Sequence, residues 1–307
     1  MKRKSECILF VMVILLLTSC MPTGPAISKQ SDEEYQKGVR ELTYFFHADA
    51  PPVEVLQRSD DSAVVILENR GAADIDSGII SLITEEPFVK VMGPTKRRFE
   101  TEGRTAGNPE GGMEQMRFDL EIGHLPQQRA RYDTEILANV CYDYASEMNE
   151  EVCIDPDPYG DLGKTEEDRV CALKDLTSSG QGGPIAIDRV KVRMNADGSG
   201  RIKPSFTIHI RNKGKGTVVE HSRLTDLCSG GAIRQEDFNQ ISLYATLRDH
   251  PLVCDMDTLQ LFKGEATVRC RDEVGVDASL GPFIAPLHIR LTYGYSDTIS
   301  RKVTIIR

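Results

Sequence analysis

The fold is decided by one stretch of sequence that occurs twice. It reads VVILENRG at residues 64–71 and returns as FTIHIRNKG at residues 206–214. In both copies an apolar strand ends at Asn-x-Gly, because Asn and Gly tolerate the backbone angles that a tight turn requires. Near the end of each half comes a long strand that closes on Tyr-x-Tyr, at residues 142–144 and again at 293–295. Two copies of one module explain why both motifs, Asn-x-Gly and Tyr-x-Tyr, occur twice.

Around these motifs, apolar and polar residues alternate with a period of two, which is typical of half-buried β-strands. Such runs lie at residues 116–122, 206–211 and 287–293. No amphipathic helix of convincing length follows residue 42. The sequence therefore predicts an all-β fold.

These strands and turns resemble the immunoglobulin-like modules that repeat on archaeal and bacterial surface proteins, of which the bacterial cell-adhesion-related domain is the best known. The resemblance covers most of residues 43–307, and the whole chain is similar to uncharacterised archaeal lipoproteins with tandem modules. It implies two immunoglobulin-like β-sandwich domains in tandem and a surface location. It supplies no catalytic residue.

The N-terminus has the features of an export signal. Three basic residues at positions 2–4 precede an apolar run at residues 8–17, which is too short to cross a bilayer. The run ends in LTSC at residues 17–20, which resembles the lipobox of prokaryotic lipoproteins. This resemblance implies cleavage before Cys20 and attachment of membrane lipid to that cysteine. An ordinary signal peptide and an uncleaved anchor are the alternatives.

The sequence divides into five parts. We expect a lipoprotein-type signal peptide at 1–20, a flexible tether at 21–42, a first immunoglobulin-like domain at 43–158, a linker at 159–184 and a second such domain at 185–307. The tether and the linker are assigned from their Pro, Gly and charged residues, which do not continue the strand pattern.

Composition restricts the function classes. The chain has 307 residues, of which 40% are hydrophobic and 27% charged, and its formal net charge is -10. These values are those of a globular protein, and the acidic balance disfavours nucleic acid as a partner. We predict an extracytoplasmic, membrane-anchored protein.

Cysteine usage predicts disulfides. Cys7 lies in the signal and Cys20 takes the lipid, which leaves an even number of cysteines in an exported chain. Closely spaced Cys-x-x-Cys pairs are absent, which disfavours zinc and iron–sulfur sites. Residues 142–152 look like a hairpin that Cys141 and Cys153 would staple, Cys254 and Cys270 flank a second strand pair, and Cys171 and Cys228 remain. The six candidates are Cys141, Cys153, Cys171, Cys228, Cys254 and Cys270.

Other candidate sites are weaker. Asp155 and Asp157, with Asp161 nearby, offer oxygen ligands for calcium, but the glycine and glutamate of an EF-hand loop do not fall in place. The six histidines share no ligand spacing, and no local nucleophile or phosphate-binding motif occurs. We therefore expect no cofactor, and we expect that the protein is not an enzyme.

Three functions remain open at this point. The first is a non-catalytic surface protein that binds an envelope protein or has a structural role in the envelope. The alternative is a secreted hydrolase, or a subunit of one, with its site at the domain junction. A third is capture of a small ligand at that junction.

Overall fold

The computed structural model describes residues 32–157, 170–196 and 198–307, and this part of the chain is all-β apart from short helical turns. The prediction of an all-β fold is confirmed. Residues 1–31, which include the expected signal and Cys20, lie outside the described residues, as do residues 158–169. We call residues 32–157 the first half and residues 170–307 the second half. Among the described residues, no helix has the length and apolar character needed to cross a membrane.

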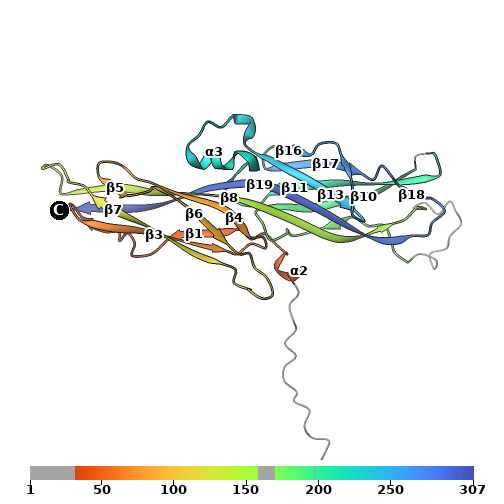
Figure 1. The fold of residues 1–307 in the computed structure, drawn as a ribbon, viewed down its shortest axis with the longest axis horizontal. Helices are drawn as coiled ribbons and strands as arrows, with labels where there is room; N and C mark the ends of the chain where they lie inside the picture. The colour runs from red at the N-terminus through yellow and green to blue at the C-terminus, as the bar shows by residue number, and fades with distance from the viewer. Residues whose placement is uncertain (1–31, 158–169, 197) are drawn as a thin grey trace, which may run out of the picture. The chain divides into compact units, whose positions relative to one another are not determined.

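The strands are distributed over both halves (Figure 1). The first half contains α2 (Asp32–Tyr35), β1 (Leu42–Phe46), β2 (Glu54–Leu56), β3 (Asp60–Asn69), β4 (Ile75–Ile83), β5 (Val89–Met92), β6 (Lys96–Thr101), β7 (Met113–Ile122) and β8 (Arg131–Ile154). The second half contains β9 (Leu176–Thr177), β10 (Ile185–Ala196), β11 (Arg201–Asn212), β12 (Thr217–Val219), η2 (His221–Arg223), α3 (Leu224–Ser229), η3 (Gln235–Asp237), β13 (Gln240–Leu247), β14 (His250–Pro251), β15 (Val253–Cys254), β16 (Thr258–Gln260), β17 (Glu265–Arg271), β18 (Val276–Asp277) and β19 (Phe283–Ile306).

Two strands of 24 residues each, β8 and β19, form the centre of the fold. They pair antiparallel along their whole length, from Arg131 opposite Ile306 to Ile154 opposite Phe283. At about 3.3 Å per residue, each strand is about 80 Å long. The sequence of β8 contains neither Gly nor Pro, so nothing in it ends the strand early.

The nine-stranded sheet around this pair is shared by the two halves. Six of its strands follow the order β14-β13-β19-β8-β4-β6, while β12 and β2 also pair with β19 and β16 pairs with β13. Strand β4 pairs with the beginning of β8, and β13 pairs with the beginning of β19. Although they belong to the second half, the last residues of the chain lie beside strands of the first half (Figure 1). Thr304–Ile306 there run parallel to β2. Each half therefore completes its part of the large sheet with a strand from the other half.

Two smaller sheets complete the fold. One has the order β1-β3-β7-β5 and belongs to the first half, and the other has the order β15-β17-β11-β10-β9 and belongs to the second. Alternate residues of each strand are buried, as the period of two predicts; Val65, Leu67, Ile208 and Ile210 are examples. Most buried apolar side chains of both halves form one continuous cluster, and a small second cluster contains Cys141, Val219, Leu224 and Cys228.

Two segments differ from what the sequence suggests. Residues 32–41 were expected in the tether, but Tyr35 is buried and Gly38 bridges Gln181. Residues 176–177 were expected in the linker, but they form β9 and pair with Arg189 and Val190. Parts of the expected tether and of the expected linker thus belong to the folded structure.

Candidate functional site

The Asn-x-Gly and Tyr-x-Tyr motifs contact each other in the first half. The Asn69 side chain accepts a hydrogen bond from Gly71 N–H (3.0 Å) and donates one to the carbonyl of Ala73 (2.9 Å). The Tyr144 hydroxyl accepts from Ala73 N–H (3.1 Å) and donates to the carbonyl of Gly182 (2.7 Å). A Cβ atom at Gly71 would overlap that hydroxyl, so the turn requires glycine. Burial raises the pKa of Tyr144 to about 12, and its hydroxyl stays protonated at neutral pH.

The second half repeats the hydrogen bonds of the turn. Asn212 accepts from Gly214 N–H (3.0 Å) and donates to the carbonyl of Gly216 (3.2 Å). The Tyr295 hydroxyl accepts from Gly216 N–H (2.7 Å). The two motifs found in the sequence are therefore one structural device, in which a tyrosine of a long strand holds the turn that ends a strand of the small sheet.

The four tyrosines of the two motifs meet where β8 and β19 cross from one half to the other. Tyr142 lies opposite Tyr295, and Tyr144 lies opposite Tyr293. Neighbouring ring centroids are 5.6 to 6.4 Å apart in tilted or edge-on arrangements. Aromatic rings in such arrangements attract each other, which stabilises the junction beyond the burial of their surface.

Equivalent tyrosines in this cluster have different surroundings. The Tyr293 hydroxyl lies 2.9 Å from the Ser146 hydroxyl and accepts from Ile185 N–H (3.3 Å). The equivalent Tyr142 hydroxyl is buried and has no hydrogen-bond partner among the described residues. On this side, Tyr44 donates to Asp297 (2.7 Å). Burial, together with the charge of Asp297, raises the pKa of the nearby Glu41 carboxyl above its ordinary value.

The second half carries an insertion that the first half lacks. Strand β4 is continuous, whereas its equivalent is split into β12, which ends with Val219 opposite Gly294, and β13, where Ser242 lies opposite Thr292. Between them, residues 220–239 leave the sheet and form η2, α3 and η3. We call residues 220–239 the insertion.

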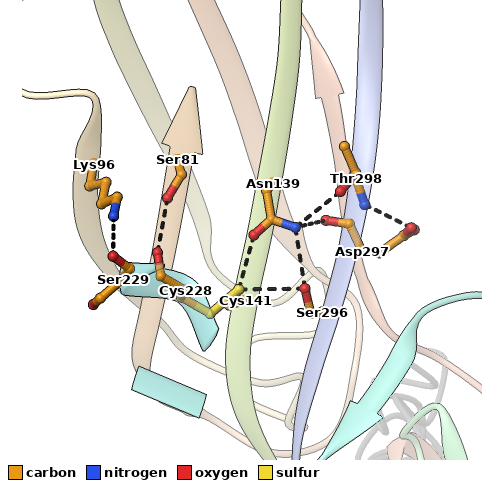
Figure 2. The surroundings of a disulfide bond; sticks show 9 residues. All are labelled: Ser81, Lys96, Asn139, Cys141, Cys228, Ser229, Ser296, Asp297 and Thr298. Atoms are coloured by element: carbon orange, nitrogen blue, oxygen red, sulfur yellow. Dashed lines mark hydrogen bonds between the residues drawn. A yellow bond between two sulfur atoms is a disulfide. The ribbon is translucent and has the colours of Figure 1, made fainter. Parts of the chain in front are cut away.

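A disulfide fastens the insertion to the first half (Figure 2). Cys228 of α3 is bonded to Cys141 of β8. Beside this bond, Lys96 of the edge strand β6 donates to the carbonyl of Ser229 (2.7 Å), and the Ser81 hydroxyl lies 3.5 Å from the Cys228 carbonyl. The insertion of one half is thus held on the sheet of the other.

Charged residues hold the insertion in one conformation. The buried carboxylate of Asp237 accepts from the backbone N–H of Arg234 (3.0 Å) and from its guanidinium (3.1 Å), and Arg223 lies 3.5 Å away. The backbone hydrogen bond and the Arg234 guanidinium lower the pKa of Asp237 below its ordinary value. His221 lies 3.0 Å from Asp143, whose pKa burial raises against the opposing effect of His221. The insertion therefore presents an ordered surface.

The six cysteines form three disulfides, and two of the expected pairings are wrong. Cys254 is bonded to Cys270 as predicted, across the paired strands β15 and β17. Cys141 is bonded to Cys228 instead of Cys153, because residues 142–152 continue β8 and form no hairpin. Cys153 is bonded to Cys171. Three disulfides are typical of proteins in an oxidising, extracytoplasmic environment.

The calcium candidates Asp155 and Asp157 are buried after the end of β8. The Asp155 carboxylate accepts from Asp157 N–H (2.9 Å), which is the hydrogen bond of a local turn. Asp161 lies outside the described residues. Within the described ranges, no group of three or more His, Cys, Asp or Glu side chains is arranged to hold a metal ion.

A cleft of about 1080 Å³ lies along the second part of β8, where Cys153 and Cys171 contribute to its wall. Glu147 there is 3.2 Å from Arg290 and 3.7 Å from His288. The sequence analysis did not single out Glu147, because an isolated Glu on a polar strand face gives no local pattern. Its carboxylate therefore contacts Arg290 and the imidazole of His288, and these contacts fix the positions of the three side chains on the sheet.

Comparisons with known proteins give no family. No family model matches the chain, and no curated protein matches it. Among solved structures, the C-terminal domain of the Streptococcus pyogenes antigen I/II-family protein AspA matches with 8% sequence identity, over 88% of this chain and 100% of that chain. Its TM-score of 0.19 is too low to indicate a shared fold.

Proposed function

We propose that this chain is a non-catalytic surface protein that presents the insertion to an envelope protein. In this proposal the first and second halves are two immunoglobulin-like β-sandwich modules, Cys20 carries the lipid anchor, and the chain is similar to archaeal tandem-module lipoproteins. The observation that carries the proposal is the insertion itself: the second half has it, the first half lacks it, and a disulfide holds it on the shared sheet.

Physical reasons support a binding role for this segment. Binding residues are often found on loops that a rigid scaffold positions, and here the scaffold is a sheet whose two central strands pair over 24 residues each. A segment that is ordered before binding loses less conformational entropy when a partner docks. The disulfide and the ion pairs of Asp237 provide that order.

Cross-linking in the native membrane tests the proposal. Deleting residues 220–240 joins Val219 to Ile241, and the register then continues from Gly294 opposite Val219 to Thr292 opposite Ser242. The deletion is combined with Cys141→Ser to avoid an unpaired thiol. A variant with residues 105–110, an exposed turn of the first half, replaced by Gly and Ser serves as the control.

We expect mass spectrometry to identify one abundant envelope protein that is captured by the wild type and by the control. The deletion variant should lose it although its melting transition is retained, and Cys20→Ala should lose it through release from the membrane. Capture of the same protein by the deletion variant would exclude the insertion as the interface. Absence of any reproducible partner of the wild type would contradict the binding role.

A further inference from the structure

Charge is divided unequally between the two halves. Residues 32–157 contain 27 acidic and 12 basic side chains, a net of -15, whereas residues 170–307 contain 15 acidic and 19 basic side chains, a net of +4. A uniform acidic surface that only maintains solubility does not require this difference. The basic residues of the second half therefore need a separate explanation.

Several of them lie on the outer face of the smaller sheet of the second half, which has the order β15-β17-β11-β10-β9 with β18 also paired to β11. Residues of β10, β11 and β17 alternate between a buried face, which includes Val190, Ile208 and Val268, and an outer face. The register places outer residues in rows across the three strands. One row is Arg189–His209–Thr267, the next is Lys191–Thr207–Arg269, and the third is Arg193–Ser205–Arg271.

These rows form a trough with basic walls. The central strand β11 contributes Ser205, Thr207 and His209, which are shorter than the Arg and Lys side chains of β10 and β17 on either side. Since neighbouring strands lie about 4.8 Å apart, the two walls are about 10 Å apart. A hollow of about 520 Å³ lies at one end, where Arg189, His209 and Thr267 line it together with the ion-paired Arg211, Asp188 and Glu265. We call this surface the basic trough.

The cations at the middle of the basic trough make no direct ion pair among the described residues, although the charge of Arg189 contributes, after the hydrogen bonds from Arg193 and Val192, to the lowered pKa of Asp175. Towards its ends, Arg193 is 3.0 Å from Asp175, and Arg211 is 3.0 Å from Glu265. Arg189, Lys191 and Arg269 make no ion pair within 4.0 Å in the part of the chain that the structure describes. Arg189 and Lys191 follow each other about 7 Å apart along β10, and cations at such a spacing match the repeated charges of a linear polyanion.

The groups between the cations indicate which polyanion fits. His209 directs Nδ1 to the Thr267 hydroxyl at 3.2 Å, and its buried Nε2 has no partner among the described residues. Imidazole and hydroxyl groups can form hydrogen bonds with sugar hydroxyls. The exposed positions of β10, β11 and β17 include no aromatic and no large apolar residue. Protein interfaces use such residues at their centres, and single-stranded nucleic acids stack on aromatic rings.

We propose that the basic trough binds a linear anionic polysaccharide, whose acidic groups contact Arg189, Lys191 and Arg269 and whose hydroxyls contact Thr207 and Thr267, with His209 orienting the Thr267 hydroxyl. The inference deepens the proposed surface function and rests on it, because the polysaccharide is a component of the envelope. It adds a second contact, on a face separate from the insertion.

Isothermal titration of the full-length chain in detergent tests this proposal. The probes are heparin as a sulfated polysaccharide, polygalacturonate as a carboxylated one and neutral dextran. The trough variant is Arg189→Gln/Lys191→Gln/Arg269→Gln. The control, Lys90→Gln/Arg98→Gln/Lys302→Gln, removes the same charge from exposed positions outside the trough.

We expect at least one of the two anionic polysaccharides to bind and dextran not to bind. The trough variant should weaken binding at least tenfold and the control less than twofold, with equal melting temperatures. The slope of log affinity against log salt should fall by about two to three in the trough variant only, since each lost cation releases about one counterion fewer.

Three outcomes would overturn the proposal. Equal weakening in both variants would mean non-specific attraction. Tighter binding of poly-glutamate or single-stranded DNA than of either polysaccharide would assign the trough to another polymer. Absence of binding to any polyanion would contradict the proposed polysaccharide site. Capture of an envelope protein through the insertion would still support the proposed function in that case.

Discussion

The two halves of this protein share a frame and differ on its surface. In both, an Asn-x-Gly turn is held by a tyrosine of a long strand, through Tyr144 in the first half and Tyr295 in the second. On the outer face of the small sheets, the row Phe45–Ile66–Gln115 of the first half corresponds to Arg189–His209–Thr267 of the second. The first row exposes an apolar ring, and the second exposes a cation.

This difference distinguishes residues that stabilise the fold from surface residues that are available for binding. Residues that hold turns or fill the core are repeated, because both halves solve the same packing problem. The insertion and the basic trough are not repeated, although the frame could carry them twice. Features that only one copy carries are therefore the better guide to function in this protein.

The largest expected effect comes from separating the halves. A fragment of residues 32–157 lacks residues 295–306 of β19, which pair with β8 over Arg131–Tyr142. We expect this fragment to remain unfolded, with no cooperative thermal transition in circular dichroism and no dispersed NMR spectrum. Adding a fragment of residues 170–307 should restore both signals. A fragment that folds alone would show that the shared strands are not required.

The next largest effect is the loss of stability when a disulfide is removed, and it should be greater for the disulfide that joins the two halves than for one within a half. Cys141–Cys228 joins residues 87 apart, and Cys254–Cys270 joins residues 16 apart. Because the longer loop restricts the unfolded chain more, replacing the first pair by Ala should cost about 4.5 kcal/mol and the second about 3 kcal/mol. Urea denaturation of the two double variants measures the difference. The reverse order would argue against chain entropy as the main source of stabilisation.

A smaller effect separates the equivalent Tyr142 and Tyr293. Tyr293→Phe leaves the buried Ile185 N–H without its partner and should cost about 1–3 kcal/mol. Tyr142→Phe removes a buried hydroxyl that has no partner in the described structure, so the variant should be neutral or slightly more stable. Chemical denaturation compares them directly. Equal losses would indicate that the Tyr142 hydroxyl has a partner in solution, such as an ordered water.

The smallest effect concerns Glu41, whose equivalent position in the second half is the uncharged Pro184. The folded protein holds the proton of Glu41 more tightly than the unfolded chain does, because its pKa is raised. The resulting stabilisation is present at low pH and is lost as pH rises above the ordinary value of 4.5.

Glu41→Gln should therefore raise the melting temperature at pH 7 by about 2 °C, and the difference should shrink towards pH 4. Thermal scans at several pH values measure it. A difference that grows as pH falls would contradict the direction of the pKa shift.

Local patterns in the sequence predicted the strands but not how they join. The alternation and the Asn-x-Gly turns depend on neighbouring residues, so they could be read directly. The contact of Tyr144 with Ala73 joins residues 71 apart and has no local pattern. Disulfide pairing is equally non-local, and only Cys254 with Cys270, on paired neighbouring strands, was predicted correctly.

The incorrect prediction of a hairpin could have been avoided from the sequence itself. A hairpin was expected between Cys141 and Cys153, yet residues 131–154 contain neither Gly nor Pro, and the alternation passes through Tyr142 and Tyr144 without a break. The segment between the two cysteines continues the strand instead of turning back. The basic trough was missed because its residues are adjacent only across strands, and the attachment of the insertion was missed because Cys141 and Cys228 lie 87 residues apart.

Because β8 and β19 pair along their whole length, the two halves form a closed unit. Each half supplies the long strand that its counterpart needs, as two subunits do in a domain-swapped dimer, but here within one polypeptide. A third copy fused to either end of the chain would find no unused long strand to complete its sheet.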